Sequence, residues 1–390
     1  MQMNDILKEE RHLEIGENKS RILHVAQAAG GVDRYIRMLL KYMDKGKFEN
    51  VLVCSQDFHE EDYKELVDDF VQVRMTRSIC GNDLKAIITV RKLIKKYKPD
   101  IVYAHSSKAG AIARIADIGL KNYCVYNPHG WAFNMRCSAK KKAMYAVIEK
   151  VAAPFCNKII CVSDAEKQSA LEKKICNEDK LQVIFNGVDI EAYENSEHGK
   201  VKRADLSIHE DAFVVGMVGR MSPQKAPDVF IRMAKLVKSE VPNAHFIIVG
   251  NGEQEEEVKK YAEDNGFLDR LHITGWVDDP MNYVELFDVA CLLSRWEGFG
   301  LALPEYMMAG KPIVASNVDA IPNIIRDGEN GLLVSVDDPV RSYEAVLKIY
   351  RDDELRDKLV VNGYRDVKKR FNARRVAKDH ERVFEKMINR

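Results

Sequence analysis

The sequence lacks a net charge, because its 390 residues hold 60 lysines and arginines against 60 aspartates and glutamates. Proteins that bind nucleic acid usually carry a basic excess, so this balance argues against a nucleic-acid partner. No apolar run reaches the roughly 18 residues that mark a membrane span. The start, MQMNDILKEERHLEIGENK, is polar and acid-rich, unlike a signal peptide. These features predict a cytoplasmic protein whose residues 1–20 form a polar N-terminal extension.

Metal and cofactor motifs are also missing. The eight cysteines form no C-x-x-C pair and the ten histidines no H-E-x-x-H, which favours reduced thiols over a zinc site. No D-x-D occurs that could hold a metal-bridged diphosphate. Neither G-x-G-x-x-G nor G-x-x-x-x-G-K-[ST] is present, so dinucleotide oxidoreductases and P-loop enzymes are weak candidates. We expect no cofactor and no metal ion.

Short runs of β-branched residues alternate with helical patterns along most of the chain. The first series of expected strands covers 21–26, 51–54, 101–104, 124–126, 159–162 and 183–185. The second covers 213–218, 245–249, 289–293, 312–315 and 332–334. Such alternation builds parallel sheets covered by helices on both faces. The predicted fold is therefore α/β, with two doubly wound sheets.

A polar stretch without periodicity at 190–206 separates the two series and is interpreted as a linker. The first domain then covers 21–189 and the second 207–372. The remaining segment, 373–390, contains a helix with no strand after it, which can pack back onto the first domain. Two such domains present the carboxyl ends of their strands to a cleft, where ligands bind.

The most informative segment is Glu297-Gly298-Phe299-Gly300-Leu301-Ala302-Leu303-Pro304-Glu305. It follows an apolar run that reads as a buried strand and leads into a helix expected to start at Pro304. Such a turn offers unpaired backbone N–H groups to an anion. Two carboxylates beside it can accept hydrogen bonds from hydroxyls, so the segment suits a phosphate next to a sugar. A plain structural turn is the alternative.

Strand ends elsewhere carry further polar residues. The first strand of the second domain is followed by Gly219, Arg220 and Lys225. The two cations can bind a diphosphate, or the segment can be a solvated loop. In the first domain, Gly30-Gly31 precede a helix and allow close backbone approach, or form a simple tight turn. His129, in NPHGWAF, occupies a strand mouth and is the stronger histidine candidate. His105, in HSSKAG, is the weaker one.

Taken in order, these motifs resemble the family 4 glycosyltransferases, which have two Rossmann-like domains in the arrangement called GT-B. The likeness rests on Gly219-Arg220, Lys225, the two glutamates, the two first-domain loops and Asn186-Gly187-Val188-Asp189. It runs from about Arg21 to the C-terminus. The segments HSSKAG and NPHGWAF look like those of bacterial enzymes that assemble capsule, exopolysaccharide or O-antigen. One departure is Ala226-Pro227, where the family commonly has glycine.

The resemblance implies a retaining transfer of a sugar from a nucleotide diphosphate sugar, with uracil as the expected base. It implies catalytic roles for Glu297, His129, Arg220 and Lys225, of which the two cations hold the diphosphate and His129 lies near the sugar. The implied donor-binding residues are Glu305 for the ribose, Trp276 and Val277 for the base, and Gly219, Phe299, Gly300 and Leu301 for the diphosphate. Gly30 and Gly31 would line the acceptor side or approach the diphosphate.

The stretch 138–148 reads as a helix with a basic start, Lys140-Lys141-Lys142, and an apolar stripe. The stripe comprises Met144, Val147, Ile148 and Val151. Packing of this stripe on its own domain is favoured. The alternative is contact with an anionic membrane or with a polyprenyl-diphosphate-linked saccharide acceptor.

Two other functions share the predicted cleft. A nucleotide-sugar 2-epimerase needs no acceptor, although the cations with the paired glutamates disfavour it. A non-catalytic nucleotide-sugar-binding partner of an assembly complex is the third reading. The sequence indicates neither the sugar, the linkage nor the oligomeric state.

Overall fold

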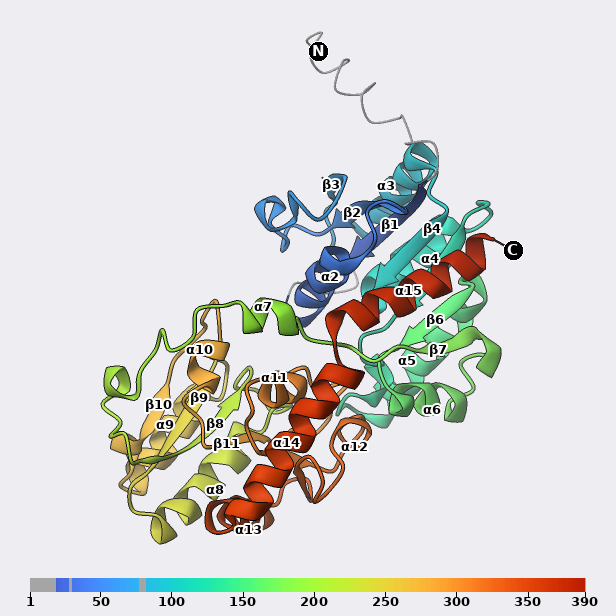
Figure 1. The fold of residues 1–390 in the computed structure, drawn as a ribbon. Helices are drawn as coiled ribbons and strands as arrows, with labels where there is room; N and C mark the ends of the chain where they lie inside the picture. The colour runs from blue at the N-terminus through green and yellow to red at the C-terminus, as the bar shows by residue number, and fades with distance from the viewer. Residues whose placement is uncertain (1–18, 28–29, 77–81, 390) are drawn as a thin grey trace. The chain divides into compact units, whose positions relative to one another are not determined.

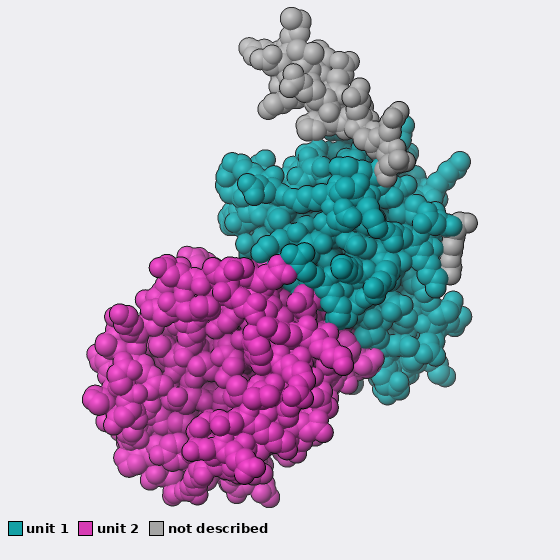
Figure 2. Space-filling view, in the orientation of Figure 1, with its two compact units in different colours: residues 1–162, 167–184, 373–390 teal, residues 163–166, 185–372 magenta. Residues whose placement is uncertain are grey.

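The computed structural model describes residues 19–27, 30–76 and 82–389. The chain divides into two compact units (Figure 2). The first unit comprises residues 1–162, 167–184 and 373–390, and the second comprises residues 163–166 and 185–372. Each unit contains one parallel sheet, so the predicted α/β class with two doubly wound sheets is confirmed.

The described residues of the first unit form a seven-stranded parallel sheet in the order β3-β2-β1-β4-β5-β6-β7. Its strands are β1 (Ser20–Ala26), β2 (Phe48–Cys54), β3 (Asp69–Gln72), β4 (Ile101–His105), β5 (Tyr123–Asn127), β6 (Lys158–Cys161) and β7 (Leu181–Val183). The central strands are buried on both faces, which explains their nearly continuous apolar sequences. The order in which successive strands are added reverses between the parallel neighbours β1 and β4, and such sheets bind ligands at this switch point.

Helices cover both faces of this sheet. One face carries α2 (Gly31–Tyr42) and α15 (Ala373–Ile388), which lie side by side in Figure 1 and share a core. The prediction that the C-terminal helix packs back onto the first domain is therefore confirmed. A second core contains residues of α3 (Asn82–Tyr97), α4 (Ser107–Asp117) and α6 (Asp164–Glu172), with α5 (Ala139–Ala152) packed against it.

The apolar stripe of α5 does not pack on its own domain, so the favoured interpretation is wrong. The four stripe residues are exposed: Met144, Val147, Ile148 and Val151. The helix is held instead by buried Glu149, whose carboxylate accepts hydrogen bonds from Arg114 and from Tyr126, each at 2.9 Å. The Arg114 guanidinium also lies 4.0 Å from the centre of the Tyr126 ring. A polar anchor on the inner side therefore leaves the apolar side uncovered.

The described residues of the second unit form a six-stranded parallel sheet in the order β10-β9-β8-β11-β12-β13. Its strands are β8 (Phe213–Val218), β9 (Ala244–Val249), β10 (Leu271–Ile273), β11 (Val289–Leu292), β12 (Ile313–Ser316) and β13 (Leu332–Val334). Its helices are α7 (Ile190–Glu194), α8 (Pro227–Glu240), α9 (Glu255–Asp264), α10 (Met281–Val284), α11 (Ala302–Met308), α12 (Ile321–Ile324), α13 (Pro339–Arg351) and α14 (Asp353–Arg370). No helix in the described ranges is long and apolar enough to cross a bilayer.

The expected strands and the observed ones differ mainly at the sheet edges. The short edge strands β3 and β10 are absent from the prediction, because they are only partly buried and lack a clear apolar pattern. The strand expected at 183–185 ends two residues earlier, since Phe185 leaves the sheet and packs against Phe299 and Phe371. The helix expected to start at Pro304 begins at Ala302.

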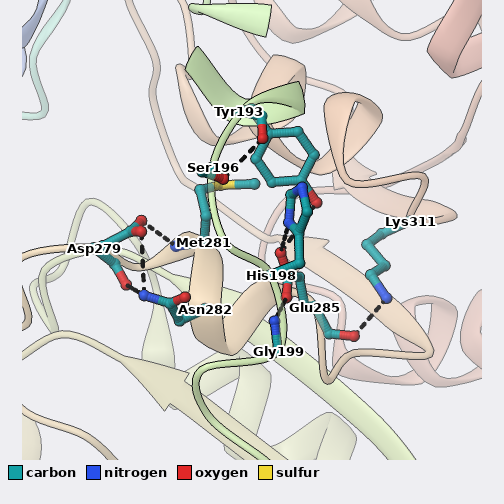
Figure 3. A network of polar contacts seen from close by, with 9 residues as sticks. All are labelled: Tyr193, Ser196, His198, Gly199, Asp279, Met281, Asn282, Glu285 and Lys311. Atoms are coloured by element: carbon teal, nitrogen blue, oxygen red, sulfur yellow. Dashed lines mark hydrogen bonds and ion pairs between the residues drawn. The ribbon is translucent and has the colours of Figure 1, made fainter. Parts of the chain in front are cut away.

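The stretch 190–206, interpreted as a linker without regular structure, begins with helix α7 and lies within the second unit. Figure 3 shows how side chains hold it there. The Glu285 carboxylate contacts Nδ1 of His198 and accepts a hydrogen bond from the Gly199 N–H at 2.9 Å. The Tyr193 ring packs edge-on against His198, with 4.6 Å between ring centres. The chain therefore crosses from the first unit to the second before this stretch, between residues 184 and 185.

Candidate active site

Three histidines from neighbouring strands of the first unit form a continuous chain. His24 of β1 places its Nδ1 3.2 Å from Nε2 of His105, the last residue of β4. Nδ1 of His105 lies 3.2 Å from Nε2 of His129, which follows β5. At the inner end, Nε2 of His24 lies 3.1 Å from Oδ1 of Asn50. The chain connects the buried sheet to the predicted strand mouth, so His105 shares a network with His129.

Burial keeps these rings uncharged. It lowers the pKa of His24 to about 4 and that of His129 to about 3, and it holds the pKa of His105 well below its ordinary value. A neutral imidazole carries one N–H and one lone pair, so all N–H groups in the chain point the same way. With Asn50 Oδ1 as acceptor, each histidine donates from Nε2. Nδ1 of His129 is then left with a lone pair.

The backbone at His129 is strained. Its φ is 51°, in the left-handed region that non-glycine residues rarely occupy. The Asn127 side chain accepts a hydrogen bond from the His129 N–H at 2.9 Å, and the Tyr35 ring meets the imidazole edge-on at 4.6 Å. Such strain persists only where the surroundings enforce it, and it concentrates at functional sites. The local structure therefore specifies one orientation for this ring.

Gly30 and Gly31 lie at the start of α2. Gly30 is exposed and has a φ of 99°, a conformation that favours glycine, while Gly31 is the first residue of the helix. Residues 28 and 29 of the same loop lie outside the described residues. A helix begins at the second glycine, as the sequence predicts, and a role of Gly30 and Gly31 in binding stays a prediction.

In the second unit, two predicted site residues meet. β8 and β11 are adjacent parallel strands, so the loops that follow them leave the same edge of the sheet. Lys225 from the first loop forms an ion pair with Glu297 from the second, and both side chains are largely buried. The Ser294 hydroxyl donates to the same carboxylate at 2.8 Å, and Asp319 accepts a hydrogen bond from the Glu297 N–H at 3.0 Å. This pair occupies the switch point of the second sheet.

Arg220 lies apart from that ion pair. Its guanidinium is 3.3 Å from the Glu253 carboxylate, in the loop after β9, and its side chain is mostly exposed. The two loops approach closely because Gly250 has no side chain, since a Cβ there would lie 2.3 Å from the carbonyl oxygen of Gly219. Arg220 is therefore a solvated cation on the same sheet edge, able to exchange its partner for an anionic ligand.

The turn between β11 and α11 has the features that the sequence predicts. Gly300 has a φ of 86°, and a Cβ there would come within 3.1 Å of the Leu292 side chain. The Phe299 side chain is buried in the aromatic cluster with Phe185 and Phe371. Within the described ranges, the N–H groups of Phe299, Gly300 and Leu301 have no hydrogen-bond acceptor. The turn is thus anchored by a side chain and offers backbone donors.

Glu305 and its neighbour Tyr306 lie on α11, and both are buried. The Tyr306 hydroxyl accepts a hydrogen bond from the N–H of Val218, the last residue of β8, at 2.8 Å. This contact fixes the helix that carries Glu305 to the strand that leads into Gly219. Sequence reasoning does not single out Tyr306. An aromatic residue next to a candidate glutamate is the only signal that could have indicated it.

Trp276 and Val277 follow β10. The Trp276 side chain is 72% exposed, while Val277 is half-buried. Gly250 and Gly275 form an isolated bridge, so this loop lies beside the one that carries Glu253. An exposed indole on the sheet edge is available for a flat ligand, although the structure does not bring it into contact with Lys225 or Glu297.

Ala226, the departure from the family pattern, caps α8 with a φ of 51°, and Pro227 is the first helical residue. Glycine adopts this left-handed conformation without strain, which explains why the family commonly has glycine nearby. Alanine there costs about 1 kcal/mol. The loop therefore keeps the backbone shape despite the substitution.

The second unit thus brings Lys225 and Glu297 into contact and places Arg220, Glu305, Trp276 and the turn 298–301 on loops and a helix around the same sheet edge. His129, Gly30 and Gly31 belong to the first unit. Among residues 19–27, 30–76 and 82–389, no three histidine, cysteine, aspartate or glutamate side chains gather as a metal ion would require.

Two doubly wound sheets in one chain, with polar loops at their switch points, define a two-domain α/β enzyme of the GT-B type. A model described as "Glycosyltransferase Family 4" matches residues 29–192, and one described as "Glycosyl transferases group 1" matches residues 200–366. The chain belongs to the family 4 glycosyltransferases and is a glycosyltransferase.

Relatives and solved structures agree with this assignment. The UDP-Gal:alpha-D-GlcNAc-diphosphoundecaprenol alpha-1,3-galactosyltransferase of Escherichia coli is 32% identical over 371 residues, covering 90% of this chain and 95% of that one. The capsular polysaccharide biosynthesis glycosyltransferase CapM of Staphylococcus aureus is 23% identical, covering 93% and 96%. Anabaena Alr3699/HepE, solved with UDP and glucose, superposes with a TM-score of 0.80 at 19% identity, covering 93% and 99%, which shows the shared fold.

Proposed function

We propose that this enzyme transfers a sugar, with retention of configuration, from a UDP-sugar to a saccharide or lipid-linked saccharide in bacterial surface polysaccharide assembly. The observation that carries the proposal is the Lys225–Glu297 ion pair at the β8/β11 switch point. The N–H groups of residues 299–301 follow it in the chain and find no acceptor in the part of the chain that the structure describes. The names of the relatives support it, since the Escherichia coli galactosyltransferase uses UDP-Gal and a diphosphoundecaprenol-linked acceptor. CapM acts in capsule biosynthesis.

The second unit binds the donor in this proposal. Lys225 and Arg220 hold the diphosphate together with the N–H groups of the turn 299–301. When Lys225 pairs with the phosphate instead of with Glu297, the Glu297 carboxylate becomes able to accept hydrogen bonds from the donor sugar. Glu305 accepts from the ribose hydroxyls, Gly219 allows close backbone approach, and Trp276 with Val277 contacts the base.

Charge development explains why cations are needed. Cleavage of the sugar–phosphate bond adds negative charge to the diphosphate while the sugar gains oxocarbenium character. Preorganised donors and cations stabilise that charge as it grows. In this proposal Lys225 and Arg220 do so without a metal ion or cofactor, in line with the absence of a D-x-D motif. The leaving phosphate oxygen receives the proton of the acceptor hydroxyl on the same face of the sugar.

The first unit supplies His129 next to the transferred sugar and Gly30 with Gly31 on the acceptor side. The histidine chain gives His129 a defined role, because its Nδ1 lone pair can accept a hydrogen bond from a substrate hydroxyl. His105 is then a positioning residue that holds the His129 tautomer. The reaction takes place on the cytoplasmic side of the membrane, where nucleotide-sugars are made.

The proposal is tested by incubating the purified protein with individual UDP-sugars and a short polyprenyl-diphosphate-linked N-acetylhexosamine. Mass spectrometry should detect one added hexose or N-acetylhexosamine, and proton NMR an α-linkage from an α-linked donor. Formation of the 2-epimer from UDP-N-acetylglucosamine alone would indicate the epimerase instead. Donor binding without transfer or hydrolysis would indicate a non-catalytic binding protein.

Replacing His105 with phenylalanine should lower kcat by about tenfold to a hundredfold, because His129 loses the acceptor that orients its N–H. The donor KM should change less than kcat, since the second unit binds the donor. His105→Gln restores an acceptor and should recover part of the turnover. Steady-state kinetics measure kcat and the donor KM of the two variants. Their melting temperatures serve as the folding control. Equal kcat in the wild type and the phenylalanine variant would rule out the positioning role.

A further inference from the structure

An exposed apolar surface covers three neighbouring helices of the first unit. Of the fifteen large apolar side chains that are exposed in the described residues, ten lie on α3, on α4 or its C-cap, and between residues 135 and 155. These ten are Leu84, Ile88, Ile115, Ile118, Met135, Met144, Val147, Ile148, Val151 and Phe155. α3 packs beside α4, and α4 contacts α5, so the three segments that carry these side chains are neighbours. We call it the α3–α5 face.

The same segment is strongly basic. Residues 82–157 contain fourteen lysines and arginines but only four aspartates and glutamates, in a chain whose overall charges balance. Two of the four acidic residues, Asp117 and Glu149, are buried, and Glu149 is paired with Arg114. Exposed lysines alternate with the apolar side chains, as at Lys85 and Lys92 on α3. The α3–α5 face therefore presents apolar groups within a positive field.

This combination selects one kind of partner. Val147 is 60% exposed and Val151 65%, so the unit itself leaves them in water, which is unfavourable for a contiguous patch. A nucleic acid would neutralise the lysines but would not bury the apolar groups. A second copy of the same face would bring like charges together. An anionic bilayer can bury the apolar side chains and also neutralise the lysines. The apolar side chains enter the acyl boundary while the lysines extend to the lipid headgroups.

We propose that the α3–α5 face docks the protein on an anionic lipid bilayer, with α5 lying in the interface. Lysines near such a surface each add to the attraction, and the attraction weakens when salt screens it. The proposal goes beyond the proposed reaction and does not depend on it, because binding to lipid requires neither donor nor transfer.

Vesicle flotation of the full-length protein, without donor, tests the proposal. The wild type should float with vesicles containing phosphatidylglycerol and have at least a tenfold lower partition coefficient for phosphatidylcholine alone. Raising salt from about 0.1 M to about 1 M shortens the screening length from about 10 Å to about 3 Å and should release protein from the anionic vesicles.

Two double variants separate this face from general surface hydrophobicity. Val147→Glu with Val151→Glu should lower partitioning into anionic vesicles at least tenfold. Val340→Glu with Val361→Glu changes two equally exposed valines of the second unit and should bind as the wild type does. All four positions are exposed, so folding should be preserved, and circular dichroism checks this.

Either of two results would overturn the proposal. One is a wild type that stays in solution with anionic vesicles. The other is equal flotation of the wild type and the Val147/Val151 variant. If the wild type ignores lipid and gel filtration shows a dimer that this variant abolishes, the face joins two copies and the membrane proposal is wrong.

Discussion

Lys225→Ala is expected to lower turnover by about a hundredfold to a thousandfold, the effect of removing one preorganised donor from a developing anion. It should also destabilise the second unit, because the largely buried Glu297 loses its counter-charge. Breaking a buried pair costs about 3–5 kcal/mol, and the partial exposure of Lys225 puts the expected loss at the lower end, about 3 kcal/mol. Steady-state kinetics and denaturant unfolding measure the two effects separately.

A double-mutant cycle separates the structural role of the pair from its chemical one. Glu297→Gln removes the charge that Lys225 would leave unpaired, so Lys225→Ala with Glu297→Gln should recover part of the lost stability. It should not recover turnover, because the cation is still absent. Lys259→Ala, in an exposed ion pair on α9, is the control and should change stability by less than about 1 kcal/mol. Wild-type turnover in Lys225→Ala would exclude the clamp.

The fold was predictable because its central strands carry uninterrupted apolar runs. The bounds expected for β8 and β13 agree with those observed, since both strands are short apolar runs with clear ends. The edge strands β3 and β10 lack this signal because most of their side chains are only partly buried, so their sequences carry no clear apolar pattern. The exposed stripe of α5 was not predictable, because periodicity shows that a helix is amphipathic but not which side packs inward. The buried Glu149 anchor decides that, and it depends on tertiary contacts.

The site was predictable to a similar extent. Lys225 and Glu297 are 72 positions apart, yet both follow strand ends, and the order of strands brings those ends together. The contact of Arg220 with Glu253 was not expected, because it joins loops after different strands through the close approach of two glycines. The sequence did not indicate Tyr306 either, because a hydroxyl that accepts a hydrogen bond from a strand N–H leaves no pattern in the sequence.

The first unit should lose stability steeply as the pH falls below neutrality. His24, His105 and His380 are fully buried, and burial lowers the pKa of His24 and His380 to about 4 and that of His105 well below its ordinary value. In the unfolded chain each titrates near 6.5. The stabilisation is therefore complete above pH 6.5 and is lost as the pH falls towards 4, because the unfolded state then binds protons that the folded state excludes.

Each excluded proton contributes about 1.4 kcal/mol per pH unit, so three buried histidines contribute about 4 kcal/mol per pH unit below 6.5. A typical domain has a total stability of about 5–15 kcal/mol, so unfolding of the first unit is expected within a few pH units. Calorimetry between pH 7.5 and 5 measures the slope. His380→Gln should lower the slope by the contribution of one proton. A flat melting temperature over this range would mean that the histidine chain accepts protons while folded, and His129 would then be charged rather than a lone-pair acceptor at the sugar.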